Sequence, residues 1–178
     1  MRPRASIGYT LLELLMVVAI LSIVAVIALP AAQRVTEAGA DIAVDEFTHA
    51  LRFARDEARR KREPRLVSCD PATGRLTVGA VDTSKDTTTP RQDTTYLAAP
   101  AASAQSAGSA MTLVSCSFTF ADNATAGSVV FDAGGAPVRG IGKGPMREKA
   151  LRAGAIVLGA GHVRRSVNLG ATGRITQS

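Results

Sequence analysis

The sequence predicts an α+β fold in which one long N-terminal helix packs on an antiparallel β-sheet domain. Helical periodicity continues over residues 9–63, and the later segments with a regular pattern alternate as strands do. A helix followed only by strands indicates an α+β arrangement rather than a parallel sheet with crossover helices. The 178 residues suffice for one ordinary domain and an anchor, but not for two full domains.

The first half of the predicted helix has the composition of a membrane span. Over residues 14–29 only Ser22 interrupts the apolar run, and residues 9–29 would form about 30 Å of helix, the thickness of a bilayer core. Residues 1–6 hold two arginines and no acid, which keeps that end cytoplasmic by the positive-inside rule. We therefore expect residues 9–30 to span a membrane once, with the later domain exported from the cytoplasm.

Glu13 is unusual within this apolar segment. A carboxylate at the centre of a spanning helix costs about 2.5–3.5 kcal/mol by insertion scales, so it needs a compensating partner. The alternative, a cleaved secretory signal peptide, has small residues near a cut at 28–32. Glu13 argues against that alternative, because an ordinary signal peptide has no use for a carboxylate in its apolar region.

The stretch GYTLLELL, residues 8–15, resembles the class III signal of type IV pilins and type II secretion pseudopilins. In that family a membrane peptidase cuts after the Gly and methylates the new N-terminus. The resemblance implies that residues 1–8 are a cleaved basic leader, with the cut between Gly8 and Tyr9 and N-methylation at Tyr9. Tyr9 replaces the usual Phe, one aromatic residue for another.

The same resemblance gives Glu13 a role in filament assembly. Cleavage creates a charged amine at Tyr9, and Glu13 of one subunit can pair with the amine of a neighbour, which offsets part of the burial cost. The alternative is that Glu13 reaches only to the membrane interface. The implied partners are the prepilin peptidase and methyltransferase, other pilins or pseudopilins, and the inner membrane.

The second half of the helix, residues 31–63, is predicted to be amphipathic. Pro30 follows the apolar run directly, where it would kink the helix rather than end it, and we group it with Glu13 as an assembly residue. Basic residues at 59–62 suit a helix C-terminus, and Pro64 stops the helix. One apolar stripe, expected to cover one sheet face, is formed by Val44, Phe47, Leu51, Ala54 and Ala58.

Residues 64–178 are expected to form the β-rich domain. Segments 65–70 and 75–81 flank a turn sequence at 71–74 and predict a hairpin. Residues 82–110, rich in Thr, Ser, Ala and Asp, predict a long mobile loop with a short strand near Tyr96. Further strands are predicted at 111–120, 128–132, 155–158, 163–169 and 174–176.

Three stretches resemble the GspH/FimT group of minor pilins and pseudopilins. They are FARDEARRKREPRLVSCD at 53–70, FDAGGAPV at 131–138 and RRSVNLGATGRI at 164–175. The resemblance implies a type IV pilin-like fold. It also implies a minor structural subunit near the tip of a type IV pilus or type II secretion pseudopilus, involved in filament assembly and protein secretion.

The sequence offers little for catalysis or metal binding. Lys143 in GIGKGP is not part of a P-loop, and His49 and His162 have no metal-ligand spacing around them. We therefore expect no enzyme, no cofactor and no metal. Cys69 and Cys116 would form a disulfide outside the cytoplasm, or remain thiols inside it.

The excess positive charge lies in the last quarter of the chain. Residues 139–178 contain eight Lys or Arg and one acid, Glu148, which suits a solvated surface, an acidic partner or a polyanion.

Some FimT-type minor pilins bind DNA through a motif ending Gly-Arg-x-Arg, but here Gly173 and Arg174 are followed by Ile and Thr. No aromatic residue follows Phe131, so base stacking is not expected there. DNA contacts in natural transformation are the alternative function, and contact with a secreted protein is a third. The candidate DNA-binding residues are Lys143, Arg147, Lys149, Arg152, Arg164, Arg165 and Arg174.

Overall fold

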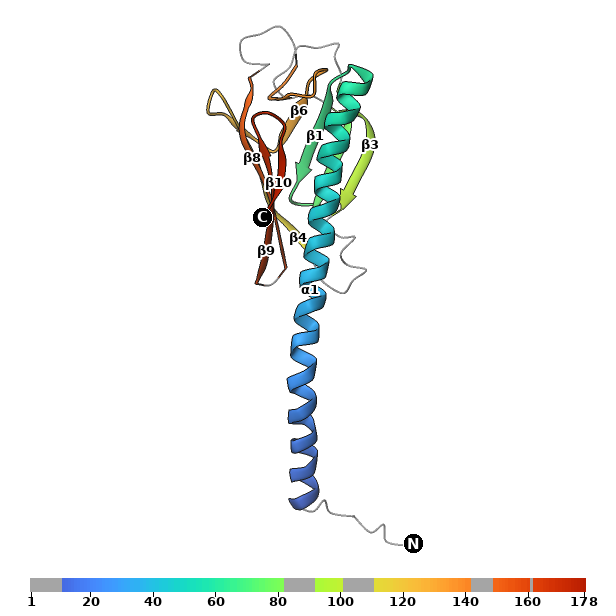
Figure 1. Ribbon diagram of the computed structural model, residues 1–178, viewed down its shortest axis with the longest axis vertical. Helices are drawn as coiled ribbons and strands as arrows, with labels where there is room; N and C mark the ends of the chain where they lie inside the picture. Colours follow the sequence, from blue (N-terminus) through green and yellow to red (C-terminus); the bar gives the residue numbers. More distant parts are fainter. Residues whose placement is uncertain (1–10, 82–91, 101–110, 142–148, 161) are drawn as a thin grey trace, which may run out of the picture. The chain divides into compact units, whose positions relative to one another are not determined.

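The computed structural model describes residues 11–81, 92–100, 111–141, 149–160 and 162–178 (Figure 1). The chain divides into two compact units, Met1–Val35 and Thr36–Ser178. The described elements are α1 (Leu11–Lys61), β1 (Arg65–Asp70), β2 (Arg75–Val81), β3 (Gln92–Pro100), β4 (Thr112–Phe120), β5 (Thr125–Ala126), β6 (Ser128–Phe131), β7 (Pro137–Val138), β8 (Leu151–Ala160), β9 (Val163–Gly170) and β10 (Ile175–Gln177).

The first unit contributes the N-terminal part of α1. Side chains of residues 11–25, mostly large and apolar, are exposed around the whole circumference of the helix. Among the described residues, no helix has the length and hydropathy needed to cross a membrane. Gly8 and Tyr9, between which cleavage is predicted, lie outside the described residues.

α1 continues without interruption through Pro30 and ends at Lys61, two residues before the predicted end. The reason for the earlier end is local. Arg62 adopts a left-handed conformation with φ 55°, and the N–H of Glu63 then donates to the carbonyl of Ala58 at 3.2 Å. A left-handed residue with this hydrogen bond is a common way for a helix to end, so α1 ends before Pro64 is reached.

The second unit contains two five-stranded sheets. The first has the order β3-β2-β1-β6-β7 and the second the order β10-β9-β8-β4-β5, and every pairing between described strands is antiparallel. The predicted fold of a helix packed on antiparallel strands is confirmed, but the strands form two sheets, and the helix stripe packs against both instead of covering one sheet face. The sheets depend on pairings such as β1 with β6 and β4 with β8, which no local pattern specifies.

Most predicted strands are present, and some are longer than expected. The hairpin of β1 and β2 has the predicted bounds and pairs Asp70 with Arg75 across its turn. β3 is a nine-residue strand within the segment predicted to be a loop with a short strand near Tyr96. Its hydrogen bonds to β2 stabilise the extended conformation, although its sequence alternates only weakly between apolar and polar residues. β8 begins at Leu151 instead of residue 155, and the two-residue strands β5 and β7 were not predicted.

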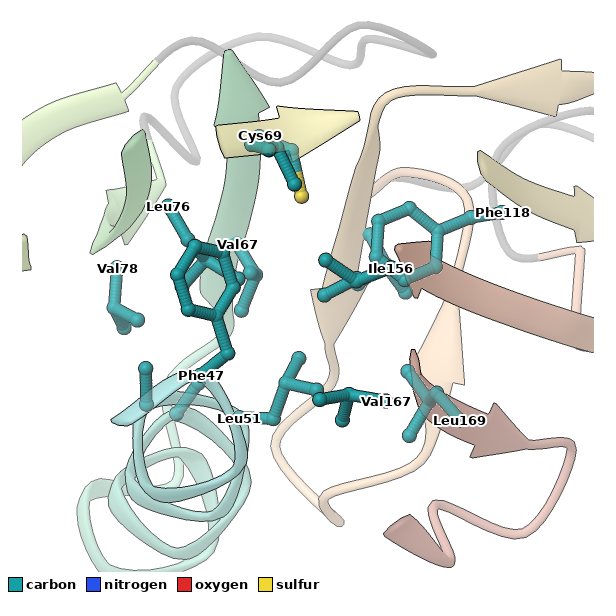
Figure 2. Packing of buried hydrophobic residues seen from close by; sticks show 14 of the residues in the cluster. Phe47, Leu51, Val67, Cys69, Leu76, Val78, Phe118, Ile156, Val167 and Leu169 are labelled. Atoms are coloured by element: carbon teal, nitrogen blue, oxygen red, sulfur yellow. The ribbon is translucent and has the colours of Figure 1, made fainter. Parts of the chain in front are cut away.

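The core of the second unit lies between α1 and both sheets. In Figure 2, Phe47 of α1 points toward Val67 and Leu76 of the first sheet, and Leu51 lies beside Val167 of the second. Burial of a large apolar side chain contributes about 1.5–3 kcal/mol each. The predicted stripe is confirmed as the buried face of the helix, with 4% or less of each residue exposed: Val44, Phe47, Leu51, Ala54 and Ala58.

A disulfide between Cys69 and Cys116 connects the two sheets. Cys69 lies in β1 of the first sheet and Cys116 in β4 of the second, with their Cα atoms 6.1 Å apart. This bridge joins segments 47 residues apart in the sequence. It therefore constrains the relative position of the two sheets, which also meet through apolar contacts and a backbone bridge between Val138 and Ala150.

Candidate functional site

Two of the predicted basic residues already have partners within the second unit. Arg165 of β9 faces α1, where its Nε donates to Oδ1 of Asp41 at 3.1 Å. Arg152 of β8 donates from Nη1 to Oδ1 of Asn123 at 2.9 Å. Both guanidinium groups therefore support the fold of the domain.

Of the three further basic candidates, Lys149 alone lies among the described residues. Lys143 and Arg147 lie outside the described residues. Lys149 is half-buried, and its carbonyl accepts a hydrogen bond from the N–H of Arg139 at 2.9 Å.

Arg164 and Arg174 remain available at the surface of the second sheet. Both are exposed, and within the described ranges neither guanidinium takes part in a hydrogen bond or ion pair. Arg164 lies over Gly159, because a Cβ added to that glycine would be 3.2 Å from Cδ of Arg164. Four of the predicted cations therefore lie in or beside the strands of the second sheet, and Arg164 and Arg174 are the two whose guanidinium groups have no partner among the described residues.

The outer face of the second sheet carries a shallow groove of about 510 Å³. One row of its lining crosses four strands, since Ser117 pairs with Ala155, Ala155 with Asn168, and Asn168 with Thr176. Alternate residues such as Phe118 point to the core, so the period-2 pattern separates core from groove. A second row has Thr119, Ala153 and Gly170, and Arg174 borders it.

Apart from Arg174, none of these groove residues was predicted from the sequence to belong to a site. Ser117 and Thr119 alternate with Phe118 and Phe120 in a way that predicts a strand with one polar face. The signal for the groove was the small size of those polar residues and of Ala153 opposite them. Only the pairing of the strands brings them together.

The charged residues in the strands of the second sheet are all basic. Its five strands contain three arginines and no Asp or Glu. In the turn after β4, Asp122 accepts hydrogen bonds from the N–H of Ala124 at 3.1 Å and from Arg139 at 2.7 Å, and these donors hold the pKa of Asp122 below its ordinary value. This carboxylate is thus already paired, and the outer face of the sheet carries Arg164 and Arg174 with no acidic residue from its own strands.

Contacts from α1 position β10 and the turn before it. Nε2 of Gln177 donates to Asp45 at 2.9 Å and to the hydroxyl of Thr48 at 3.0 Å. Nη1 of Arg55 donates to the carbonyl of Gly173 at 3.1 Å. Because Gly173 directly precedes Arg174, these contacts hold the backbone that carries Arg174 at the groove.

The remaining predicted residues do not form a chemical centre. Glu13 lies exposed in the first described turn of α1, and Pro30 lies within the same helix. Among the residues whose positions are described, no group of three or more His, Cys, Asp or Glu could hold a metal ion.

Comparisons with known proteins give two family matches. The prokaryotic N-terminal methylation motif matches residues 3–29, and the family of the type II transport protein GspH matches residues 43–173. No curated protein is significantly similar to the chain.

Two crystal structures of the type IV minor pilin FimU of Pseudomonas aeruginosa PAO1 are also similar. In space group P21 the identity is 16%, the match covers 80% of this chain and 90% of FimU, and the TM-score is 0.46. In space group P65 the corresponding values are 15%, 78%, 91% and 0.43. Because the GspH family pattern covers well over half of the sequence, the chain belongs to the GspH family of type II transport proteins.

Proposed function

We propose that this protein is a minor pilin or pseudopilin, anchored in the inner membrane by residues 9–30, whose β-rich domain lies in the periplasm. One observation carries the proposal, which is that an N-terminal methylation motif and a GspH domain occur on the same chain. α1 runs unbroken from the one match into the other, as a subunit that assembles through its N-terminal helix requires. Proteins of this class are structural subunits, not enzymes.

Assembly would begin with cleavage between Gly8 and Tyr9 and methylation of the new amine. Glu13 would then pair with the Tyr9 amine of a neighbouring subunit, which offsets the cost of a carboxylate in an apolar surrounding. The family description as a type II transport protein favours a secretion pseudopilus over a pilus.

Mass spectrometry of the N-terminus tests this proposal. When the chain is co-expressed with its prepilin peptidase, we expect a product that begins at Tyr9 and carries one added methyl group. Gly8→Leu should leave the leader attached, whereas Ser6→Ala, in the same leader, should be processed normally. A product cut near residues 28–32, as by a signal peptidase, would contradict the proposal.

Incorporation into filaments is the second part of the test. Sheared surface filaments of cells with a pilus system, and of cells that overproduce a pseudopilus, should be probed for the chain. Recovery from one filament and not the other decides between pilus and pseudopilus. Its absence from both would argue against a filament role.

DNA binding through the basic C-terminal region has less support from the geometry. Arg152 and Arg165 already bind Asn123 and Asp41. Of the described candidates, Arg164 and Arg174 have the guanidinium groups left for phosphate contacts. Specific DNA-binding proteins commonly use about 6–10 such contacts, so two would hold a duplex weakly.

A further inference from the structure

We propose that the groove on the outer face of the second sheet docks an extended, acidic peptide segment of a partner protein. The groove is the space of about 510 Å³ lined by β4, β8, β9, β10 and Arg174. The proposed filament role does not involve this surface, so the docking proposal can be tested independently of that role.

The shape of the groove fits a single extended chain. Its floor is built by residues with little or no side chain, Ala153, Ala155 and Gly170, which let another backbone approach closely. Thr119 supplies a hydroxyl, and Asn168, whose Nδ2 donates to Ser166 and Ser178, supplies an amide oxygen that can accept from the peptide N–H groups of such a chain. The volume is within the range of about 300–1,000 Å³ that is usual for ligand sites.

The charges fit an acidic segment rather than a neutral one. Arg164 lies beyond the groove lining, near one end of β9 on the same outer face. Arg174 borders the groove beside Gly170 at the other end, where the N–H of Gly170 donates to the carbonyl of Arg174 at 2.8 Å. Six residues of strand separate positions 164 and 170, or about 20 Å. A bound peptide in extended conformation has the same rise per residue. Carboxylates six residues apart on it would therefore reach both guanidinium groups.

Among the residues that the structure describes, no acid pairs with either of these two arginines. The strands of the second sheet contain no carboxylate, and Asp41 and Asp122, from neighbouring segments, are paired with Arg165 and Arg139. An incoming carboxylate would thus find two cations whose hydrogen-bond donors are not used elsewhere in the described structure.

The same features disfavour a nucleic acid as the occupant. Two cations give two phosphate contacts, which leaves duplex binding weak and steeply dependent on salt. Single strands are held mainly by stacking on aromatic side chains, and none of the residues that line the groove is aromatic. The hydroxyl, amide and small residues of the groove suit a peptide backbone instead.

Fluorescence anisotropy with the full chain in nonionic detergent at low salt tests the proposal. The probe is a fluorescein-labelled peptide, Asp-Ser-Thr-Ser-Thr-Ser-Asp, whose carboxylates have the spacing of the two arginines. We expect saturable binding that is tighter than for two control peptides. One replaces both Asp with Asn, and the other, Asp-Ser-Asp-Ser-Thr-Ser-Thr, keeps the charge but shortens the spacing.

Variants of the chain locate the binding site. Arg164→Gln and Arg174→Gln should each weaken binding about two- to fivefold, the range of an exposed ion pair. Ala155→Phe, which fills the middle of the groove, should abolish binding. Arg75→Gln removes an exposed arginine from β2 of the first sheet and should leave affinity unchanged. Unfolding midpoints in urea identify any variant that is misfolded. If Ala155→Phe is misfolded, the location of the binding site is judged from the two arginine variants alone.

Several results would overturn the proposal. They are an absence of saturable binding, equal affinity for the acidic and the Asn peptide, and binding that Ala155→Phe leaves unchanged in a folded protein. Tighter binding of a fluorescein-labelled DNA duplex, lost in Arg164→Gln and Arg174→Gln, would assign the surface to nucleic acid instead.

Discussion

Arg59 of α1 lies against Gly135, in the turn after β6, and fills the space that a side chain would need there. Nε of Arg59 donates to the carbonyl of the preceding residue, Gly134, at 3.0 Å. Gly135 has φ 79°, and a Cβ added to it would be 2.7 Å from Cγ of Arg59. The C-terminal turn of the helix thus depends on a glycine 76 positions later in the sequence.

Replacement of this glycine should destabilise the domain. Gly135→Ala forces a Cβ into the left-handed region and against Arg59, and we expect the free energy of unfolding to fall by about 1–3 kcal/mol. Urea unfolding followed by circular dichroism measures it. Gly134→Ala is the matched control, because that glycine has no positive φ and a Cβ there would be 3.3 Å from Asp132. An equal loss in both variants would show that the Arg59 contact does not matter.

Two phenylalanines of α1 should respond differently to truncation. Phe47 is fully buried between the helix and the sheets, and Phe47→Ala should lower the free energy of unfolding by about 3–5 kcal/mol. Phe53 is 39% exposed on the same helix, and Phe53→Ala should cost less than about 1 kcal/mol. Chemical denaturation of both variants checks the difference. Similar costs would contradict the assignment of the buried face.

The disulfide between Cys69 and Cys116 should contribute measurably to stability. It closes a loop between positions 47 residues apart, so its reduction should lower the free energy of unfolding by about 2–4 kcal/mol. The masses of the protein after alkylation with and without reductant show whether the bridge forms in the protein isolated from cells. The Cys69→Ser/Cys116→Ser double variant should be insensitive to reductant. Free thiols in the untreated protein would contradict the expectation.

The hairpin turn after β1 should be sensitive to acid. The hydroxyl of Thr73 donates to Asp70 at 2.8 Å and the N–H of Ala72 at 3.0 Å, and these donors lower the pKa of Asp70 from its ordinary value of 3.8. Because the folded-state pKa is the lower one, this carboxylate stabilises the fold above pH 3.8. Its contribution is lost as the pH falls from there through the folded-state pKa.

A titration of carboxyl ¹³C shifts by NMR tests this cause. Thr73→Ala removes the largest contribution, so the pKa of Asp70 should rise toward its ordinary value, and the acid-dependent loss of stability should become smaller. The pKa of Asp122, which is lowered by Ala124 and Arg139, should not move and serves as the control in the same spectrum. An unchanged pKa of Asp70 would show that Thr73 is not its main donor.

Glu13 should matter for assembly and not for cleavage. Glu13→Val removes the carboxylate and its cost of about 2.5–3.5 kcal/mol in hydrocarbon, so the variant should be cut at Gly8 but remain in the membrane. The N-terminal mass and the amount of chain in sheared filaments measure the two steps separately. Ser22→Ala, in the same apolar segment, should assemble normally. Normal assembly of Glu13→Val would rule out the proposed pairing with the Tyr9 amine.

Local patterns in the sequence determined much of this protein. A 3.6-residue period identified the buried stripe of α1 around Phe47, and a turn sequence between two alternating segments identified the hairpin of β1 and β2. The methylation motif was likewise readable from residues 8–15, because it depends on neighbours in the chain. Such features need only contacts within a few residues.

Tertiary structure alone decided the number of sheets, the presence of the groove, and which arginines are paired and which are exposed. Arg164 and Arg165 are adjacent in the sequence, yet one is exposed over Gly159 and the other pairs with Asp41, 124 residues away. Successive residues of a strand point to opposite faces, so their surroundings depend on which strand or helix packs on each face. Which element packs there depends on the pairing of distant segments, such as β4 with β8. The free energy of such a pairing depends on the residues of both strands, so neither segment predicts it alone.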